Sequence, residues 1–290
     1  MSGDAAAGPV WTVVLAGGGG TRFGGPKQFF DLGGRPLLEH PVLATGPVSD
    51  GVVVVLPAAL LDRWRPEPTP GWPEVVVTTG GDTRAESVRA GLAAVPADAG
   101  VIVITDAAHP LASTGLYRLV VDTVRGGADA AVPGLPLTEV VKEVGPGEPS
   151  RRQAGAVTGA DADRGEHPGE PTLVAGRSLP RETHRLVQTP HAFRADLLRA
   201  AHAEATEAVE DSAMVAARGA VVVVVPGEPA NVHVTTPAEL AMARRLLGAG
   251  ADPATGWTGS PEGRGSTIDV AGVPGGRRVP VADGAPSAWH

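Results

Sequence analysis

The sequence predicts an α/β fold with a mostly parallel central sheet. Short runs rich in β-branched residues recur along the chain, and amphipathic stretches with a 3.6-residue period lie between them. Strands that alternate with helices are typical of βαβ units, whose strands pair in parallel.

The expected strands are almost uniformly apolar. Runs of this composition are typical of strands that are buried on both faces of a sheet. The runs lie at residues 10–16, 52–56, 75–79, 101–105, 130–133 and 221–225.

The expected helices have the length and periodicity of a helix packed on a sheet, and they lie at residues 36–44, 84–95 and 115–125. In parallel α/β sheets, ligands bind in the loops that follow the carboxyl ends of the strands. We therefore expect the chemistry in those loops.

Composition excludes several classes of function. A net charge of -8 and a pI near 5.5 argue against a nucleic-acid or anionic-membrane partner. The chain has no cysteine, which excludes disulfides, thiolate nucleophiles and zinc–thiolate clusters. No signal peptide or membrane-spanning run is evident, so we expect a cytoplasmic protein.

Two stretches lack hydrophobic periodicity. Residues 145–177 and 249–290 are rich in glycine, proline and charge, a composition that buries too little apolar surface to offset the entropy of ordering. We expect one domain over residues 1–248 that carries 145–177 as a flexible arm insertion, followed by a disordered tail over 249–290.

The loop after the first strand contains four consecutive glycines, at residues 17–20, and then Arg22 and Lys27. Glycine lets backbone N–H groups approach a polyphosphate, and the two cations could neutralise its charge. The spacing matches neither the dinucleotide fingerprint G-x-G-x-x-G nor the P-loop, in which a serine or threonine follows the lysine. A glycine-rich hairpin with incidental basic residues is the alternative.

Five strings in this chain together resemble the methylerythritol-phosphate and ribitol-phosphate cytidylyltransferases. Residues 15–22 (LAGGGGTR) with 26–29 (PKQF) form the first string. The others follow in the family's order, at residues 80–92, 106–110, 188–190 and 231–240. The resemblance covers residues 13 to about 247 and implies a Rossmann-like sheet of the nucleotidyltransferase type with a protruding dimerisation arm.

The resemblance implies attack by an acceptor phosphate oxygen on the α-phosphorus of CTP, with release of pyrophosphate. It implies Mg²⁺ as cofactor, held by Asp106, since Mg²⁺ prefers a carboxylate together with phosphate oxygens. The catalytic residues it implies are Arg22, Lys27, Arg181 and His233. The residues it implies for CTP binding are Ala16, Gly17, Gly18, Gly81, Asp82, Ser87, Asp106 and Ala107. Two alternatives stay open: Asp106 could be a turn residue, and Asp82-Thr83 could serve only to cap the following helix.

The resemblance also implies a homodimer in which an arm carrying Arg181 completes the neighbouring site. The acceptor would then be bound by His109, Val140, Arg181 and His233. The family usually has arginine at the position of His109, lysine at His233, and threonine at Val140. These departures predict a less cationic, less hydroxyl-binding pocket, and therefore poor turnover of methylerythritol phosphate that improves toward pH 6 if a histidine protonates.

The leading hypothesis is a CTP-dependent cytidylyltransferase in isoprenoid precursor synthesis, with 2-C-methyl-D-erythritol 4-phosphate as acceptor. Within the class, the alternative is a diverged enzyme for another polyol phosphate or a phosphonate. From other classes come a catalytically silent nucleotide-binding homologue, which would be expected to have lost Lys27 or Asp106, and a nicotinamide-dependent oxidoreductase, which would need the absent glycine fingerprint.

Overall fold

The computed structural model describes residues 6–18, 23–66, 72–146, 173–204 and 210–248, together with the backbone of two short strands, β13 (Thr267–Ile268) and β14 (Val279–Pro280). Arg22 and most of the predicted tail lie outside the described residues. The chain divides into two compact units, one made of residues 1–135 and 187–290 and the other of residues 136–186. We call them the core unit and the arm unit.

An eight-stranded sheet has the order β10-β7-β11-β6-β1-β4-β5, with β12 paired to β7. Its strands are β1 (Val10–Leu15), β4 (Gly51–Leu56), β5 (Glu74–Thr79), β6 (Val101–Asp106), β7 (Ala130–Pro136), β10 (Arg185–Val187), β11 (His191–Arg194) and β12 (Val222–Pro226). The pairs β1–β4, β1–β6, β4–β5 and β7–β12 are parallel, and β11 runs antiparallel to β6 and β7. The prediction of a mostly parallel α/β sheet is confirmed.

Burial differs from the prediction at two strands. β5 and β12 were expected to be buried on both faces, but most of their residues are partly exposed, and Val224 is 47% exposed. The physical reason is their position, because β5 ends the strand order and, among the strands that the structure describes, β12 pairs with β7 alone.

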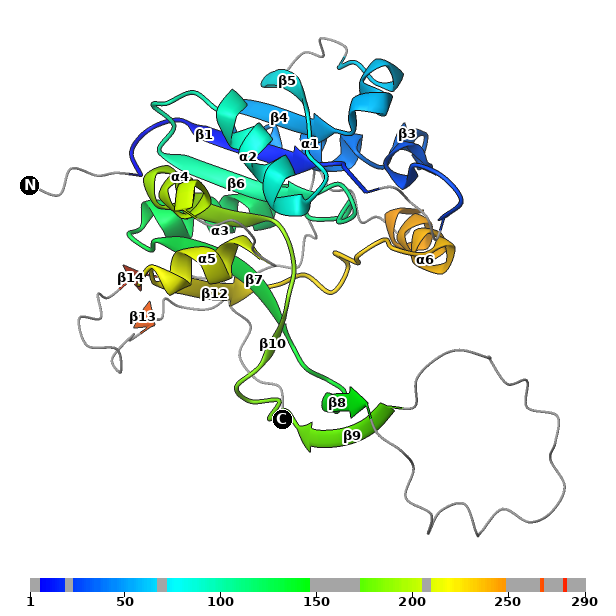
Figure 1. Cartoon of the computed structure of the whole chain (residues 1–290), viewed down its shortest axis with the longest axis vertical. Coiled ribbons are helices and arrows are strands. Elements are labelled where there is room, and N and C mark those ends of the chain that lie inside the picture. Colours follow the sequence, from blue (N-terminus) through cyan, green and yellow to red (C-terminus); the bar gives the residue numbers. More distant parts are fainter. Residues whose placement is uncertain are drawn as a thin grey trace, which may run out of the picture. The chain divides into compact units, whose positions relative to one another are not determined.

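Helices cover both faces of the sheet (Figure 1). They are α1 (Glu39–Thr45), α2 (Arg84–Ala94), α3 (Thr114–Arg125), α4 (Ala195–Glu204), α5 (Asp211–Ala217) and α6 (Pro237–Gly248). Side chains alternate along β1, so Val13 packs in one cluster with α2, α4 and α5, whereas Val10 packs in another with α3. The core therefore lies in two layers, one on each side of the strands.

The packing of α2 against β1 depends on Gly91. A Cβ at this position would fall 2.5 Å from Cγ1 of Val13, so only glycine lets the helix lie this close. Close packing brings the N-terminus of α2 beside the loop that follows β1.

Short elements follow the loop after β1 and lead into α1: the 3₁₀ turn η2 (Lys27–Phe29) and the small hairpin of β2 (Asp31–Leu32) with β3 (Arg35–Pro36). Another 3₁₀ turn, η3 (Ala58–Arg63), follows β4.

The arm unit contains an antiparallel pair, β8 (Lys142–Pro146) and β9 (Leu173–Ser178). Its strands are largely exposed, and Arg177 pairs with Glu143 at 2.7 Å. Residues 145–146 and 173–177 of the predicted flexible insertion thus belong to strands, and residues 147–172 lie outside the described residues. Among the described helices, none is long and apolar enough to cross a membrane.

Candidate active site

A cavity of about 340 Å³ opens at the carboxyl ends of the parallel strands in the core unit. Its wall consists of residues 15–18 after β1, residues 81–84 and Ser87 around the start of α2, and residues 106–108 after β6. Lys27, Gln28, Leu37 and His233 complete the lining. The cavity therefore lies where the strand pattern predicted the chemistry.

The ends of β1 and β6 meet because the two strands are in register, with Leu15 opposite Asp106. The backbone N–H of Ala107 donates to Leu15 O at 2.9 Å, which continues the pairing one step into the loops. Of the predicted CTP-binding residues, Ala16, Gly17, Gly18 and Ala107 line this part of the cavity.

At the start of α2, different residues cap the helix and line the cavity. Thr83 is the N-cap, since its Oγ1 accepts from the N–H of Glu86 at 3.1 Å and its own N–H donates to Glu86 Oε2 at 2.9 Å. The cap therefore does not use the carboxylate of Asp82, which lines the cavity with Gly81 and Ser87. Ser87 Oγ donates to Gly81 O at 3.4 Å.

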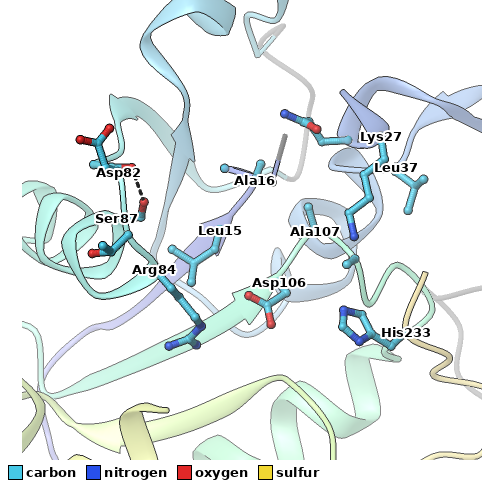
Figure 2. A pocket seen from close by; sticks show the side chains of 16 residues that line it. Leu15, Ala16, Lys27, Leu37, Asp82, Arg84, Ser87, Asp106, Ala107 and His233 are labelled. Atoms are coloured by element: carbon cyan, nitrogen blue, oxygen red, sulfur yellow. Dashed lines mark hydrogen bonds between the residues drawn. The ribbon is translucent and has the colours of Figure 1, made fainter. Parts of the chain in front are cut away.

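Lys27 is fixed by a residue more than 200 positions later in the sequence. Its Nζ donates to Val234 O at 2.8 Å, and the N–H of Val234 donates to Ala108 O at 2.7 Å. The backbone of one residue thus ties the lysine to the loop after β6. Lys27 and His233 lie on one side of the cavity, Asp82 and Ser87 lie on the other, and Asp106 lies between them (Figure 2).

Two of the motif strings hold this segment in position. Gln188 Nε2 donates to Asn231 O at 2.8 Å, and Asn231 Nδ2 donates to Thr189 O at 2.8 Å. All three side chains are buried, and none of the three lines the cavity. Their contacts fix the backbone that carries His233.

His109 lies behind His233. The two rings are stacked, with centroids 4.5 Å apart and planes 8° from parallel, and His109 is 7% exposed and absent from the cavity wall. Its Nδ1 lies 3.0 Å from Thr189 Oγ1. Burial above all, together with the nearby charges of His233, His191 and Lys27, lowers the pKa of His109 to about 3. The expectation that His109 could become cationic near pH 6 is therefore wrong.

Asp106 is suited to a magnesium–phosphate site. Among the described residues, no three His, Asp or Glu side chains are close enough to form a metal cluster of their own. Mg²⁺ in nucleotide sites commonly takes only one or two carboxylates and completes its shell with phosphate oxygens and water. The carboxylate of Asp106 on the cavity wall fits that donor set.

Six residues of the wall were not predicted as site residues, and they are Leu15, Gln28, Leu37, Thr83, Arg84 and Ala108. Arg84 and Gln28 have the longest polar side chains among them. Arg84 forms an ion pair with the buried Asp211 at 2.7 Å. Gln28 is 3% exposed, and neither atom of its side-chain amide has a hydrogen-bond partner among the residues that the structure describes. Both lie inside the strings that carried the family resemblance, but the pairing of Arg84 with a residue so distant in sequence left no local signal.

The arm unit holds the remaining predicted residues. Val140 is 63% exposed, and Arg181 Nη1 donates to Thr138 O at 3.0 Å within the same unit. Their predicted roles in binding the acceptor stay predictions.

Known proteins match most of the chain. The profile of the IspD family, described as 2-C-methyl-D-erythritol 4-phosphate cytidylyltransferase, matches residues 10–151 and 162–249. Two similar relatives bear that name: one from Streptomyces coelicolor is 39% identical over 81% of this chain and 83% of its own length, and one from Rhodococcus jostii is 39% identical over 84% and 97%.

Solved structures agree with this likeness. The crystal structure of 2-C-methyl-D-erythritol 4-phosphate cytidylyltransferase from Thermus thermophilus is 30% identical, with a TM-score of 0.59 over 81% of this chain and 97% of that chain. A synthase structure from Anaerococcus prevotii is 20% identical with a TM-score of 0.61, which supports the fold alone.

Proposed function

This chain belongs to the 2-C-methyl-D-erythritol 4-phosphate cytidylyltransferase family, and we propose that it transfers CMP from CTP to 2-C-methyl-D-erythritol 4-phosphate, a step in isoprenoid precursor synthesis. An acceptor phosphate oxygen forms a bond to the α-phosphorus of CTP. The bond from that phosphorus to the bridging oxygen breaks, and pyrophosphate leaves with the electron pair. The observation that carries the proposal is the convergence of Lys27, Asp82, Ser87 and Asp106 on one cavity from separate segments of the chain.

On the nucleotide side, the loop after β1 offers the backbone of Ala16, Gly17 and Gly18 to the phosphates and ribose, opposite Ala107. The start of α2 reads the base. Cytosine presents an exocyclic amine where uracil presents a carbonyl, so an acceptor such as the carboxylate of Asp82 favours cytosine. Ser87 lies at the same end of the cavity as Asp82 and also binds the nucleotide.

Charge neutralisation is the main catalytic requirement, because two anions must meet. Lys27 lines the cavity, and its Nζ is fixed by its bond to Val234 O. We assign Arg22, from the same loop, to the same task by family resemblance. Preorganised cations of this kind lower the barrier by several kcal/mol.

Mg²⁺, when bound, would supply further positive charge to the triphosphate. Asp106 would hold it together with phosphate oxygens. The backbone N–H of Asp106 donates to Thr189 Oγ1 at 3.3 Å, which helps fix the loop that presents the carboxylate.

On the acceptor side, His233 faces the cavity and the neutral His109 supports it by stacking. We extend the proposal to a cytoplasmic homodimer in which the arm of one protomer brings Arg181 and Val140 to the acceptor site of the other. An arginine suits this task because its guanidinium can grip a phosphate with two N–H groups.

A pyrophosphate-release assay tests the proposed function. Release should require CTP, 2-C-methyl-D-erythritol 4-phosphate and Mg²⁺ together, should stop with EDTA and return when excess Mg²⁺ is added. Lys27→Ala, purified in parallel, controls for a contaminating enzyme. Release that continues without the acceptor, or equal release by the Lys27→Ala protein, would contradict the proposal.

A further inference from the structure

Arg84 reaches the cavity from the first residue of α2. Its guanidinium lies on the side of Asp82 and Ser87, next to Asp106 (Figure 2). Its side chain is 32% exposed and lines the cavity, so Arg84 is accessible to a ligand bound there. A guanidinium carries five N–H donors in a fixed plane, and one carboxylate partner does not occupy all of them.

The partner of Arg84 is itself held. Asp211 is 1% exposed, and its Oδ2 lies 2.7 Å from Nη2 of Arg84, while its Oδ1 lies 2.9 Å from Nε2 of His202. An ionised carboxylate only accepts hydrogen bonds, so the imidazole must present an N–H at Nε2. The two oxygens of Asp211 thus have fixed, opposite partners.

The N-terminus of α5 fixes the backbone of Asp211. Asp211 is the first residue of α5, and the N-cap Glu210 accepts from the N–H groups of Ser212 at 2.9 Å and Ala213 at 3.1 Å. Because the helix end and His202 both restrain Asp211, the carboxylate restrains Arg84 in turn.

The charges agree with this geometry. Burial alone would lower the pKa of Arg84, but the negative charge of Asp211, whose Oδ2 lies 2.7 Å from Nη2, outweighs it, so the pKa is raised. Burial alone would raise the pKa of Asp211, but the bonds from His202 and Arg84 outweigh it, so the pKa is lowered. Both partners are therefore charged at neutral pH.

We propose that Arg84 is a further nucleotide-binding residue, whose remaining N–H groups donate to oxygens of CTP, and that Asp211 is the positioning residue that fixes its guanidinium. The location on the side of Asp82 and Ser87, away from Lys27 and His233, assigns Arg84 to the nucleotide rather than to the acceptor. Since this inference rests on the proposed function, its test measures CTP binding by calorimetry, which needs no acceptor and no turnover.

The first variant is Arg84→Met, which keeps an unbranched side chain and removes the donors. Its Kd for CTP in the presence of Mg²⁺ should rise by about 10- to 100-fold, the range expected for loss of a charge-assisted hydrogen bond. In turnover, the KM for CTP should rise while the KM for the acceptor stays unchanged. Arg89→Met, on the same helix but away from the cavity wall, is the matched control and should bind CTP as the wild type does.

The second variant is Asp211→Asn, which keeps the shape of the side chain but weakens its hold on the guanidinium. Its Kd for CTP should rise by about 3- to 10-fold. The double variant that combines Arg84→Met with Asp211→Asn should bind CTP no more weakly than Arg84→Met alone, because Asp211 acts only through Arg84. A merely structural ion pair would lower the melting temperature without producing this pattern in CTP affinity.

Arg84→Lys covers the case in which Arg84→Met fails to fold, since it keeps a charge opposite Asp211 but loses the planar donor set. It should fold and still bind CTP at least about fivefold more weakly than the wild type. A folded Arg84→Met or Arg84→Lys protein that binds CTP within about twofold of the wild type would overturn the inference. So would a double variant whose loss of affinity is the product of the two single losses.

Discussion

His109 should make the folded protein less stable in mild acid. His109 is 7% exposed, and burial, together with the nearby charges of His233, His191 and Lys27, lowers its pKa to about 3, against an ordinary value of 6.5 in the unfolded chain. Below pH 6.5 the unfolded chain therefore binds a proton that the folded protein does not bind. The free energy of unfolding must fall as the pH falls through this window, and the fall continues until the pH approaches the folded pKa.

The size of the effect follows from the two pKa values. Between about pH 7.5 and pH 5, uptake of one proton by the unfolded chain alone costs about 2 kcal/mol. The pKa of the buried His40 is also lowered by burial, so its contribution has the same sign. The lowered pKa values of Glu210 and Asp211 act below about pH 4.5, where those carboxylates protonate in the unfolded chain, and so lie outside the window.

Urea unfolding at the two pH values, followed by circular dichroism, measures this effect. His109→Gln removes the titrating ring, so its loss of stability from about pH 7.5 to pH 5 should be smaller than that of the wild type by about 2 kcal/mol. Val121→Ala is the control: it deletes buried apolar volume without changing a titratable group, and should lower stability equally at both pH values. An identical pH dependence in His109→Gln and the wild type would refute the assignment of a neutral, buried His109.

Three further predictions follow from the cavity. Lys27→Ala should lower kcat by about 100-fold or more while the protein stays folded, as measured by pyrophosphate release and circular dichroism. A rate near that of the wild type would mean that the loop after β1 has only a structural role. CTP should be used at least about 100-fold better than UTP, and Asp82→Asn should narrow that ratio; comparable turnover of UTP by the wild type would sink the base assignment. Mixing inactive Lys27→Ala with inactive Arg181→Ala protomers should restore some activity; no rescue despite proven subunit exchange would count against a shared site.

Much of the fold could be predicted because it depends on local pattern. All six apolar runs are strands and all three amphipathic stretches contain helices, since burial on a parallel sheet imposes its periodicity on the sequence. The strand β11 escaped prediction because its four residues, HAFR, are too few to show a period. It nevertheless lies between β6 and β7, where it makes the sheet mixed.

The site could be predicted in part for a related reason. Residues such as Ala16, Asp82 and Asp106 lie at or just after strand ends, so a parallel sheet brings them to one edge. The ion pair of Arg84 with Asp211 joins segments far apart in sequence, so no local sequence pattern predicts it. The place of His109 behind His233 likewise depends on how two loops pack, which decides whether its ring is charged.

For the identity of the acceptor, the substitutions in this sequence and the family membership point to different answers. The substitutions at His109, Val140 and His233 predicted poor use of methylerythritol phosphate. In the core unit, only His233 of the two histidines faces the cavity, while relatives that are 39% identical are named for that acceptor. The substitution at His109 therefore changes a residue that packs against His233 and not a residue of the cavity wall.

The most direct test of the proposed function is kcat/KM with CTP for 2-C-methyl-D-erythritol 4-phosphate beside ribitol phosphate, glycerol phosphate and small hydroxyalkyl phosphonates. We expect 2-C-methyl-D-erythritol 4-phosphate to be the best substrate, with a value of about 10⁴ M⁻¹s⁻¹ or higher, in the range typical of enzymes. A roughly tenfold preference for any other acceptor, or no transfer to any of them by a folded protein that binds CTP, would contradict it.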